Sequence, residues 1–295
     1  MTNTRSQIVS QQVGWAANRR IAVTSGYTES LDGNLFQPLH SDTLAEFQRG
    51  SGDELGRNGH RGKMQALHSS SALAVNVFDY WRGQSLAWVA RALSLTSEPS
   101  LLRFEAQFAT GLPGNPPNLD LAFVLTDRRT VAVESKFTEP YAHAKQVPPF
   151  KLKYFPAGDG LWHNRALPQC QRLADRLQRG ELEFLYLNAA QLLKHILGLA
   201  QLSVGQFTLF YLWYAARSDE GRHHGEDLRQ GDRFRSRFSC PHLSRAVFLS
   251  TTRSRDRARG VRELPRGAVL PGMTVLMHDL SFSAGEFEIW SAWGL

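Results

Sequence analysis

The chain has 295 residues, of which 42% are hydrophobic and 21% charged, so it can bury a sizeable core and is not an intrinsically disordered protein. Its two cysteines, Cys170 and Cys240, lack the spacing of a zinc site or a disulfide framework and favour a reducing, cytoplasmic location. Residues 1–14 are too polar for a signal peptide, and polar residues interrupt the apolar stretch 184–216, so we expect no membrane span.

Positive charge is concentrated in the C-terminal part of the chain. The formal net charge of +7 and the pI near 9.7 favour a polyanionic partner such as nucleic acid. Residues 217–266 hold 13 arginines and seven acidic residues, a surplus of six positive charges. A compositional bias toward arginine on a solvated surface is the alternative explanation. The candidate contacts to nucleic-acid phosphates are the alternating arginines Arg253, Arg255, Arg257 and Arg259.

The N-terminal part of the chain shows little regular pattern before a helix. We divide the chain into a partly irregular extension, residues 1–60, and a domain of residues 61–295 with an arginine-rich C-terminal part. Residues 1–40 are expected to be irregular or weakly structured. Apolar periodicity then predicts a helix over residues 63–81 and a short second helix over 85–93.

Three consecutive strands are predicted next. Residues 101–109 alternate apolar and polar side chains, which is the period of a strand. The same alternation continues in residues 119–125 and 131–137, on either side of a short turn over 126–130. Helices are predicted over 168–178 and 188–199, the second with Asn188 as its N-cap. Further strands are expected at 207–215, 246–251, 274–277 and 287–290. This order predicts an α/β fold with a mixed central sheet flanked by helices.

The hairpin brings two carboxylates and a lysine to one face of the predicted sheet. A three-residue loop Asp127–Arg129 would place Asp120 opposite Lys136, with Glu134 a diagonal neighbour at roughly 7–8 Å. A loop of two or four residues would turn Asp120 to the other face, so the site requires an odd loop length. Glu105 on the preceding strand falls about level with Asp120 and is an additional candidate acid.

These residue types suit the hydrolysis of a phosphodiester. Mg²⁺ prefers oxygen ligands and is typically held by one or two carboxylates together with substrate phosphate, so Asp120 and Glu134 are candidate ligands; Mn²⁺ is expected to substitute. Lys136 can stabilise the attacking hydroxide or the transition state. A structural cross-strand ion pair is the alternative. The apolar surroundings of these charges and the small neighbours Ala122 and Ala132 favour a site.

The spacing of these residues carries a family resemblance. Asp120, followed after fourteen positions by Glu134-Ser135-Lys136 on consecutive strands, resembles the PD-(D/E)xK nuclease superfamily. The runs Asn118–Asp120 and Val133–Pro140, with the preceding helix His68–Asn76, are similar to its restriction-endonuclease-like group. The resemblance covers roughly residues 60–280. Its specific part is short, and the agreement with the expected element order strengthens it.

The resemblance implies a core of a helix, a three-stranded antiparallel meander, a helix and a strand. It also implies Mg²⁺ held by Asp120, Glu134 and the backbone carbonyl of Ser135, with Lys136 positioning the nucleophile. One departure is that Leu119, rather than proline, precedes Asp120. Two glutamines of the following helix are candidates for a polar position that some members use, a solvent-facing helix being the alternative: Gln169 and Gln171.

Other sites have weaker support in the sequence. His223 and His224, with Glu226 and Asp227, are a second candidate metal site, although adjacent histidines on a charged segment are usually exposed. No serine-hydrolase elbow, P-loop or dinucleotide-binding glycine motif is present. The leading hypothesis is therefore a Mg²⁺-dependent DNA endonuclease, for which cleavage of both strands favours a homodimer. A catalytically inactive DNA-binding module of the same fold and a two-carboxylate glycosidase are the alternatives.

Overall fold

The computed structural model describes residues 3–50, 52–57, 59–143, 149–158, 160–202, 207–216, 218–238, 246–250 and 274–277, and from residue 229 onward it describes the backbone alone. Several predicted features fall outside these ranges. They are Cys240, the candidate phosphate contacts Arg253, Arg255, Arg257 and Arg259, and the strand predicted over residues 287–290.

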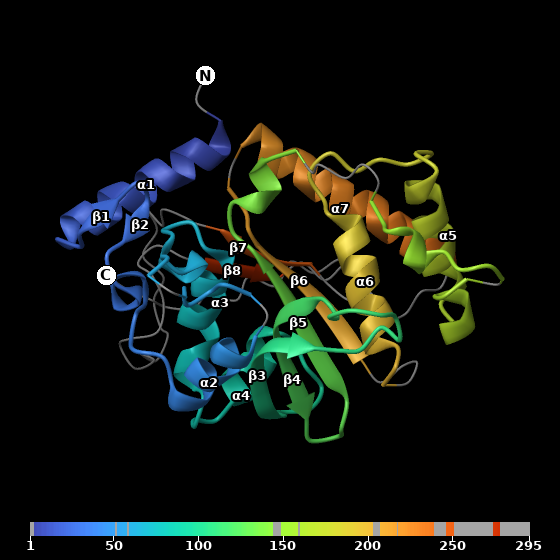
Figure 1. Cartoon of the computed structure of the whole chain (residues 1–295), viewed down its shortest axis with the longest axis horizontal. Helices are drawn as coiled ribbons and strands as arrows, with labels where there is room; N and C mark the ends of the chain where they lie inside the picture. Colours follow the sequence, from blue (N-terminus) through green and yellow to red (C-terminus); the bar gives the residue numbers. More distant parts are fainter. Residues whose placement is uncertain are drawn as a thin grey trace, which may run out of the picture.

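A mixed sheet forms the centre of the described chain (Figure 1). Its six strands lie in the order β3-β4-β5-β6-β7-β8. β4 is antiparallel to both β3 and β5, whereas β5, β6 and β7 run parallel to one another and β8 is antiparallel to β7. The bounds are Pro99–Gln107 for β3, Asn118–Leu125 for β4, Thr130–Lys136 for β5, Phe207–Tyr214 for β6, Ala246–Ser250 for β7 and Thr274–Met277 for β8. The predicted mixed α/β architecture is confirmed.

Helices flank the sheet on both sides (Figure 1). The bounds are Thr4–Asn18 for α1, Ser41–Arg49 for α2, Ser70–Phe78 for α3, Ala87–Ala92 for α4, Pro168–Gln178 for α5, Ala189–Leu199 for α6 and Asp219–Phe238 for α7. A small hairpin of β1, Val23–Thr24, and β2, Tyr27–Thr28, lies beside α1. Among the described helices, none combines the length and the apolar composition that crossing a bilayer requires.

The two faces of the central strands β4 and β5 carry different side chains. Leu121 and Phe123 of β4 are fully buried, and the Phe123 ring packs edge-on against Phe78 of α3, with ring centroids 5.8 Å apart. Their neighbours on the opposite face include Asp120 and, on β5, Glu134, which α6 covers. The alternation of strand side chains thus directs the carboxylates toward α6 and the apolar side chains toward α3.

The β4–β5 turn has the predicted odd length but a different register. Leu125 N donates to Arg129 O at 2.8 Å, so the loop consists of Thr126, Asp127 and Arg128. Arg128 takes the left-handed conformation, with φ 69°, at the position where three-residue hairpin loops need it. Val124 therefore pairs with Thr130, and the predicted pairing of Thr126 with Thr130 is wrong.

The shifted register changes the partners of the candidate site residues. The pairs Ala122–Ala132 and Leu121–Val133, continued by one residue, set Asp120 opposite Glu134. The predicted arrangement, with Asp120 opposite Lys136 and Glu134 on the diagonal, is therefore incorrect. Because the shift moves the pairing by two positions, every side chain keeps its predicted face.

Several helix predictions also require correction. The segment predicted as irregular contains α1, of which only Thr4, Ile8 and Ala16 are buried, so its sequence has little apolar periodicity. The helix predicted from residue 63 begins at Ser70, because Ser69 caps it by accepting a hydrogen bond from Ala72 N and residue 66 is extended. α7 occupies a charged segment for which no helix was predicted.

Edge strand β3 is held by a carboxylate of α2. The Glu46 carboxylate accepts a hydrogen bond from Phe104 N at 2.9 Å and forms an ion pair with Arg82 at 2.6 Å. Arg82 also lies 3.6 Å from the buried Asp79, which accepts a hydrogen bond from His40 N at the start of α2. This network satisfies an edge N–H of β3 and fixes the end of α2 beside Glu105.

The close approach of α6 to the β3–β4 loop can be tested at Gly198. A Cβ at Gly198 would lie 2.4 Å from Phe108 O, so we expect Gly198→Ala to lower the free energy of unfolding by about 1–3 kcal/mol. Gly14→Ala in α1 is the control, because a Cβ there meets nothing within 4 Å and alanine favours a helix by up to about 1 kcal/mol. Urea unfolding measures both. Equal effects of the two substitutions would contradict this packing.

Candidate active site

The site lies where β4 begins and β5 ends. Asp120 is half-buried, and its Oδ2 accepts a hydrogen bond from the backbone N–H of Ser135 at 2.5 Å. This bond and the strand register place the carboxyl groups of Asp120 and Glu134 on the same face of neighbouring strands. The structure thus brings Asp120, Glu134 and Lys136 together at one end of these two central strands.

Glu134 is buried and surrounded by polar partners. Its side chain is 2% exposed, and its Oε1 receives an ion pair from Lys136 Nζ and a hydrogen bond from Gln191 Nε2 at 2.7 Å. The Nε2 atom of the fully buried His195 lies 3.1 Å from Glu134 Oε2. That contact lacks hydrogen-bond geometry, so among the described residues the buried Oε2 has no hydrogen-bond partner.

The two carboxylates have opposite electrostatic environments. For Asp120, burial and the negative charge of Glu134 raise the pKa well above its ordinary value. Burial acts in the same direction on Glu134, but its contacts with Lys136 and His195 outweigh burial and lower the Glu134 pKa to about 2. The negative charges of Glu134 and Asp120 raise the pKa of Lys136 despite its burial. One lysine thus compensates one of the two acids, and the proton affinity of the other remains high.

Glu105 is a third acid at the same end of the sheet. The register places Phe104 opposite Leu121 and Ala106 opposite Leu119, so Glu105 is level with Asp120. Burial and the nearby Glu54 raise the pKa of Glu105 to about 7. The residue also has a left-handed backbone, with φ 49°, which is a strained conformation for a glutamate within a strand.

The segment after α2 covers the Glu105 carboxylate. A Cβ at Gly50 would lie 3.0 Å from Glu105 Oε2, and one at Gly52 would lie 3.5 Å from the same atom. Asn118 Nδ2 donates to Glu105 from the start of β4. The nearby Glu54 forms an ion pair with Lys63, whose Nζ lies 3.8 Å from Glu54 Oε1. Gly50 therefore packs closely against the Glu105 carboxylate, and Gly52 lies beside it.

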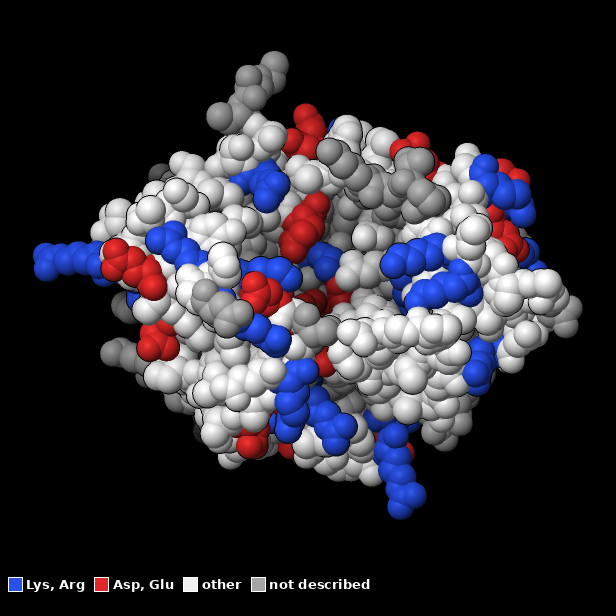
Figure 2. Space-filling model, viewed as in Figure 1, with Lys and Arg blue, Asp and Glu red and all other residues white. Residues whose placement is uncertain are grey.

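A hollow is visible near the middle of the molecule on the face that Figure 2 shows. Acidic side chains lie within it and beside it, and lysine and arginine side chains stand around its rim (Figure 2). Glu139, an exposed acid just after β5, adds negative charge that acts on both Asp120 and Lys136. This face combines negative charge at its centre with positive charge at its margin.

Two residues of α6 that border Glu134 were not predicted. Gln191 and His195 are spaced by four positions, so they share one face of the helix. The signal that could have identified them is two polar residues on the buried face of an otherwise apolar helix. By contrast, the candidate Gln171 accepts a hydrogen bond from Trp162 N and donates one to Asp175.

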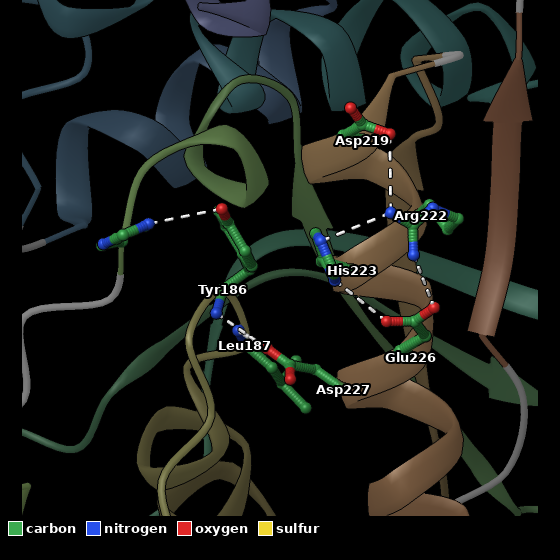
Figure 3. A network of polar contacts seen from close by, with 8 residues as sticks. Tyr186, Leu187, Asp219, Arg222, His223, Glu226 and Asp227 are labelled. Atoms are coloured by element: carbon green, nitrogen blue, oxygen red, sulfur yellow. Dashed lines mark hydrogen bonds and ion pairs between the residues drawn. The ribbon is translucent and has the colours of Figure 1, made fainter.

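The two adjacent histidines lie in different environments, and Figure 3 shows that of His223. His223 lies on the surface of α7, with Nδ1 2.9 Å from Glu226 Oε2 and its ring stacked on Tyr186. Asp227 accepts hydrogen bonds from the backbone N–H groups of Tyr186 and Leu187. His224 is fully buried and packs against Trp213, with ring centroids 4.5 Å apart. The expectation that both histidines are exposed is wrong.

The acidic residues where β4 begins and β5 ends fit a hard divalent cation. No group of three or more histidine, cysteine or acidic side chains with metal-binding geometry occurs among the described residues. Asp120 and Glu134 supply two carboxylates, which is the number that Mg²⁺ typically takes from a protein. Glu134 Oε2, a buried oxygen that makes no hydrogen bond within the part of the chain that the structure describes, is one that a cation would satisfy.

Comparison with known proteins identifies the family. A protein-family profile described as "restriction endonuclease associating with ARP" matches residues 6–252. The chain belongs to this family. This match confirms the resemblance to restriction-endonuclease-like proteins. Searches of the curated proteins and of the solved structures find no match to this restriction endonuclease family member.

The raised pKa of Glu105 predicts a pH-dependent stability. Its folded-state pKa of about 7 exceeds the ordinary value of 4.5, so the stabilisation present below about pH 4.5 is lost as the pH rises through about 7. We expect Glu105→Gln to flatten this decline, leaving the part due to Asp120, whereas Glu29→Gln at an exposed position leaves it unchanged. Urea unfolding at a series of pH values measures the effect. Parallel curves for Glu105→Gln and wild type would exclude this assignment.

Proposed function

We propose that this protein is a Mg²⁺-dependent endonuclease that hydrolyses the phosphodiester bonds of DNA. The observation that carries the proposal is the pairing of Asp120 with Glu134 across two strands, with Lys136 bound to Glu134, in a member of a restriction endonuclease family. Two carboxylates and a lysine suit a charged phosphate better than a neutral sugar, which disfavours a glycosidase.

Asp120, Glu134 and the backbone carbonyl of Ser135 are the groups that would hold the cation. When bound, Mg²⁺ or Mn²⁺ would supply a polarised phosphoryl oxygen and an activated water. Asp120 would lose its raised proton affinity in favour of the cation, because a positive charge beside a carboxylate favours its ionised form. The hydrogen bond from Ser135 N fixes one oxygen of Asp120 and leaves the other for a ligand.

Lys136 is suited to stabilise developing negative charge. Its side chain is 14% exposed, compared with 2% for its partner Glu134, so the lysine forms the boundary between the buried acid and the open edge. An ammonium group anchored in this way needs little rearrangement during the reaction. Lys136 would orient the attacking water and neutralise the charge that forms on the phosphate.

Gln191 and His195 are proposed to orient Glu134. They approach separate oxygens of its carboxylate from one face of α6, at 2.7 Å and 3.1 Å. Ligands held by such outer partners keep their geometry when a metal binds. Glu105 is an additional acid of the site, and its pKa of about 7 suits proton transfer near neutral pH.

The element order is consistent with a restriction-endonuclease-like core. α3 precedes the β3–β4–β5 meander, and α5 and α6 connect β5 to the parallel strand β6. This is the proposed sequence of helix, meander, helix and strand, with α4 inserted after α3. A homodimer remains part of the proposal, because cleavage of both strands of a duplex needs two active sites or two successive events.

Incubation with supercoiled plasmid and Mg²⁺ tests the proposed reaction. We expect the wild-type protein to nick or linearise the plasmid, and Asp120→Ala and Lys136→Ala each to lower the rate at least about 100-fold, as loss of a group that stabilises the transition state does. Asp127→Ala is the matched control, because Asp127 lies in the exposed β4–β5 turn and pairs with Arg129. It should cleave at the wild-type rate.

Two results would overturn the proposal. Retention of DNA on a filter without cleavage, unchanged by Asp120→Ala or Lys136→Ala, would show an inactive DNA-binding module. Equal cleavage in Mg²⁺ and in a chelator would exclude the cation.

A further inference from the structure

An exposed leucine lies between two lysines on a short helical turn. Leu152 is 83% exposed, whereas no other large hydrophobic side chain that the structure describes exceeds 50%. It begins η5, the single 3₁₀ turn Leu152–Tyr154, and its neighbours Lys151 and Lys153 are both exposed. Single exposed apolar residues are common on protein surfaces, so exposure alone does not imply a function.

The base of this turn is firmly packed. Tyr154 stacks on the fully buried Trp162 at 6.2 Å, and Phe150 meets the same ring edge-on at 5.6 Å. Trp162 Nε1 donates to Leu193 O of α6 at 2.8 Å. The turn is therefore fixed to the helix that carries Gln191, and Leu152 projects from a rigid support.

Three lysines gather around this support. Lys153 Nζ lies 5.7 Å from the centre of the Tyr154 ring, and Lys194 Nζ lies 5.6 Å from the same point. The positive charge of Lys151 acts on Lys194. In the part of the chain that the structure describes, none of these lysines forms an ion pair with an acid. Like charges held together without a counter-charge favour an anionic ligand.

The lysine cluster is connected to two elements that carry residues of the candidate active site. Lys153 Nζ donates to Pro113 O in the β3–β4 loop, which leads directly into the strand that carries Asp120. Lys194 lies on α6, three positions after Gln191, and its Nζ donates to Pro149 O at 3.2 Å. A polymer bound at the acids would therefore pass close to this turn.

We propose that Lys151, Leu152, Lys153 and Lys194 form a nucleic-acid contact in which the lysines bind phosphates and Leu152 inserts between neighbouring bases. This inference rests on the proposed function, because it takes DNA as the substrate. An apolar tip with cations around it matches an apolar base stack bordered by phosphates. An anionic membrane offers a similar chemistry, but the connection to the acids through α6 and the β3–β4 loop favours nucleic acid.

Duplex binding in a chelator tests the contact without cleavage. Short mixed-sequence duplexes containing 2-aminopurine report affinity by anisotropy and base unstacking by a rise in emission. We expect Leu152→Ala to bind about ten-fold more weakly and to lose the emission rise, with an unchanged salt dependence, because insertion of an apolar wedge unstacks bases without binding phosphate. Lys151→Gln should lower the salt slope by about one.

Matched variants control for general surface effects. Leu202→Ala removes an exposed leucine, 41% exposed, that follows α6, and Arg91→Gln removes an exposed cation of α4. Both should behave as wild type. Leu152 and Lys151 are exposed, so their variants are expected to fold normally.

Three outcomes would overturn the inference. They are wild-type affinity and emission in Leu152→Ala, the same salt slope for Lys151→Gln and Arg91→Gln, and binding to phosphatidylserine vesicles but not to duplexes. The plasmid assay separates this test from the proposed function. If the wild-type protein cleaves the plasmid but Leu152→Ala and Lys151→Gln bind duplexes as wild type does, only the contact is rejected. If the variants show the expected binding defects but the wild-type protein does not cleave, only the endonuclease is rejected.

Discussion

The burial of the Glu134 carboxylate is the constraint on which the rest of the site depends. An ionised carboxylate in the interior is costly unless it is paired and hydrogen-bonded, and removing one partner of a buried pair typically costs about 3–5 kcal/mol. Here Lys136 of the same strand and Gln191 of α6 supply the partners. α6 must therefore lie close against β5, and Gly198 permits this by letting the helix touch Phe108.

The same constraint separates the roles of the acids. Lys136 pairs with Glu134 and offsets only part of the effect that burial and the negative charge of Glu134 have on Asp120, whose pKa therefore stays raised. Glu105, one strand further out, has a raised pKa from burial and from Glu54. A row of acids with insufficient positive charge is poorly stable by itself but well prepared for a divalent cation. The strained backbone of Glu105 fits this account, because such strain is concentrated at functional sites.

Sequence patterns predicted the strands and the shared face of the acids, because alternation has a period of two and an odd loop preserves it. They did not predict the pairing of Asp120 with Glu134. That pairing depends on the left-handed conformation of Arg128, the residue just before the expected end of the loop. No glycine stands at this position to indicate such a conformation in the sequence. Gln191 and His195 were missed because only tertiary packing places α6 against β5. α1 was missed because it buries three residues and has no clear apolar stripe.

The central claim is that Asp120 and Glu134 share one divalent cation. Anomalous diffraction from crystals soaked in Mn²⁺ tests it most directly. The account predicts a peak within about 2.0–2.3 Å of carboxylate oxygens of both residues, near the Ser135 carbonyl, and its loss in Asp120→Asn. A peak only at the surface cluster of His223 and Glu226, or no peak between the two strands at saturating Mn²⁺, would contradict it.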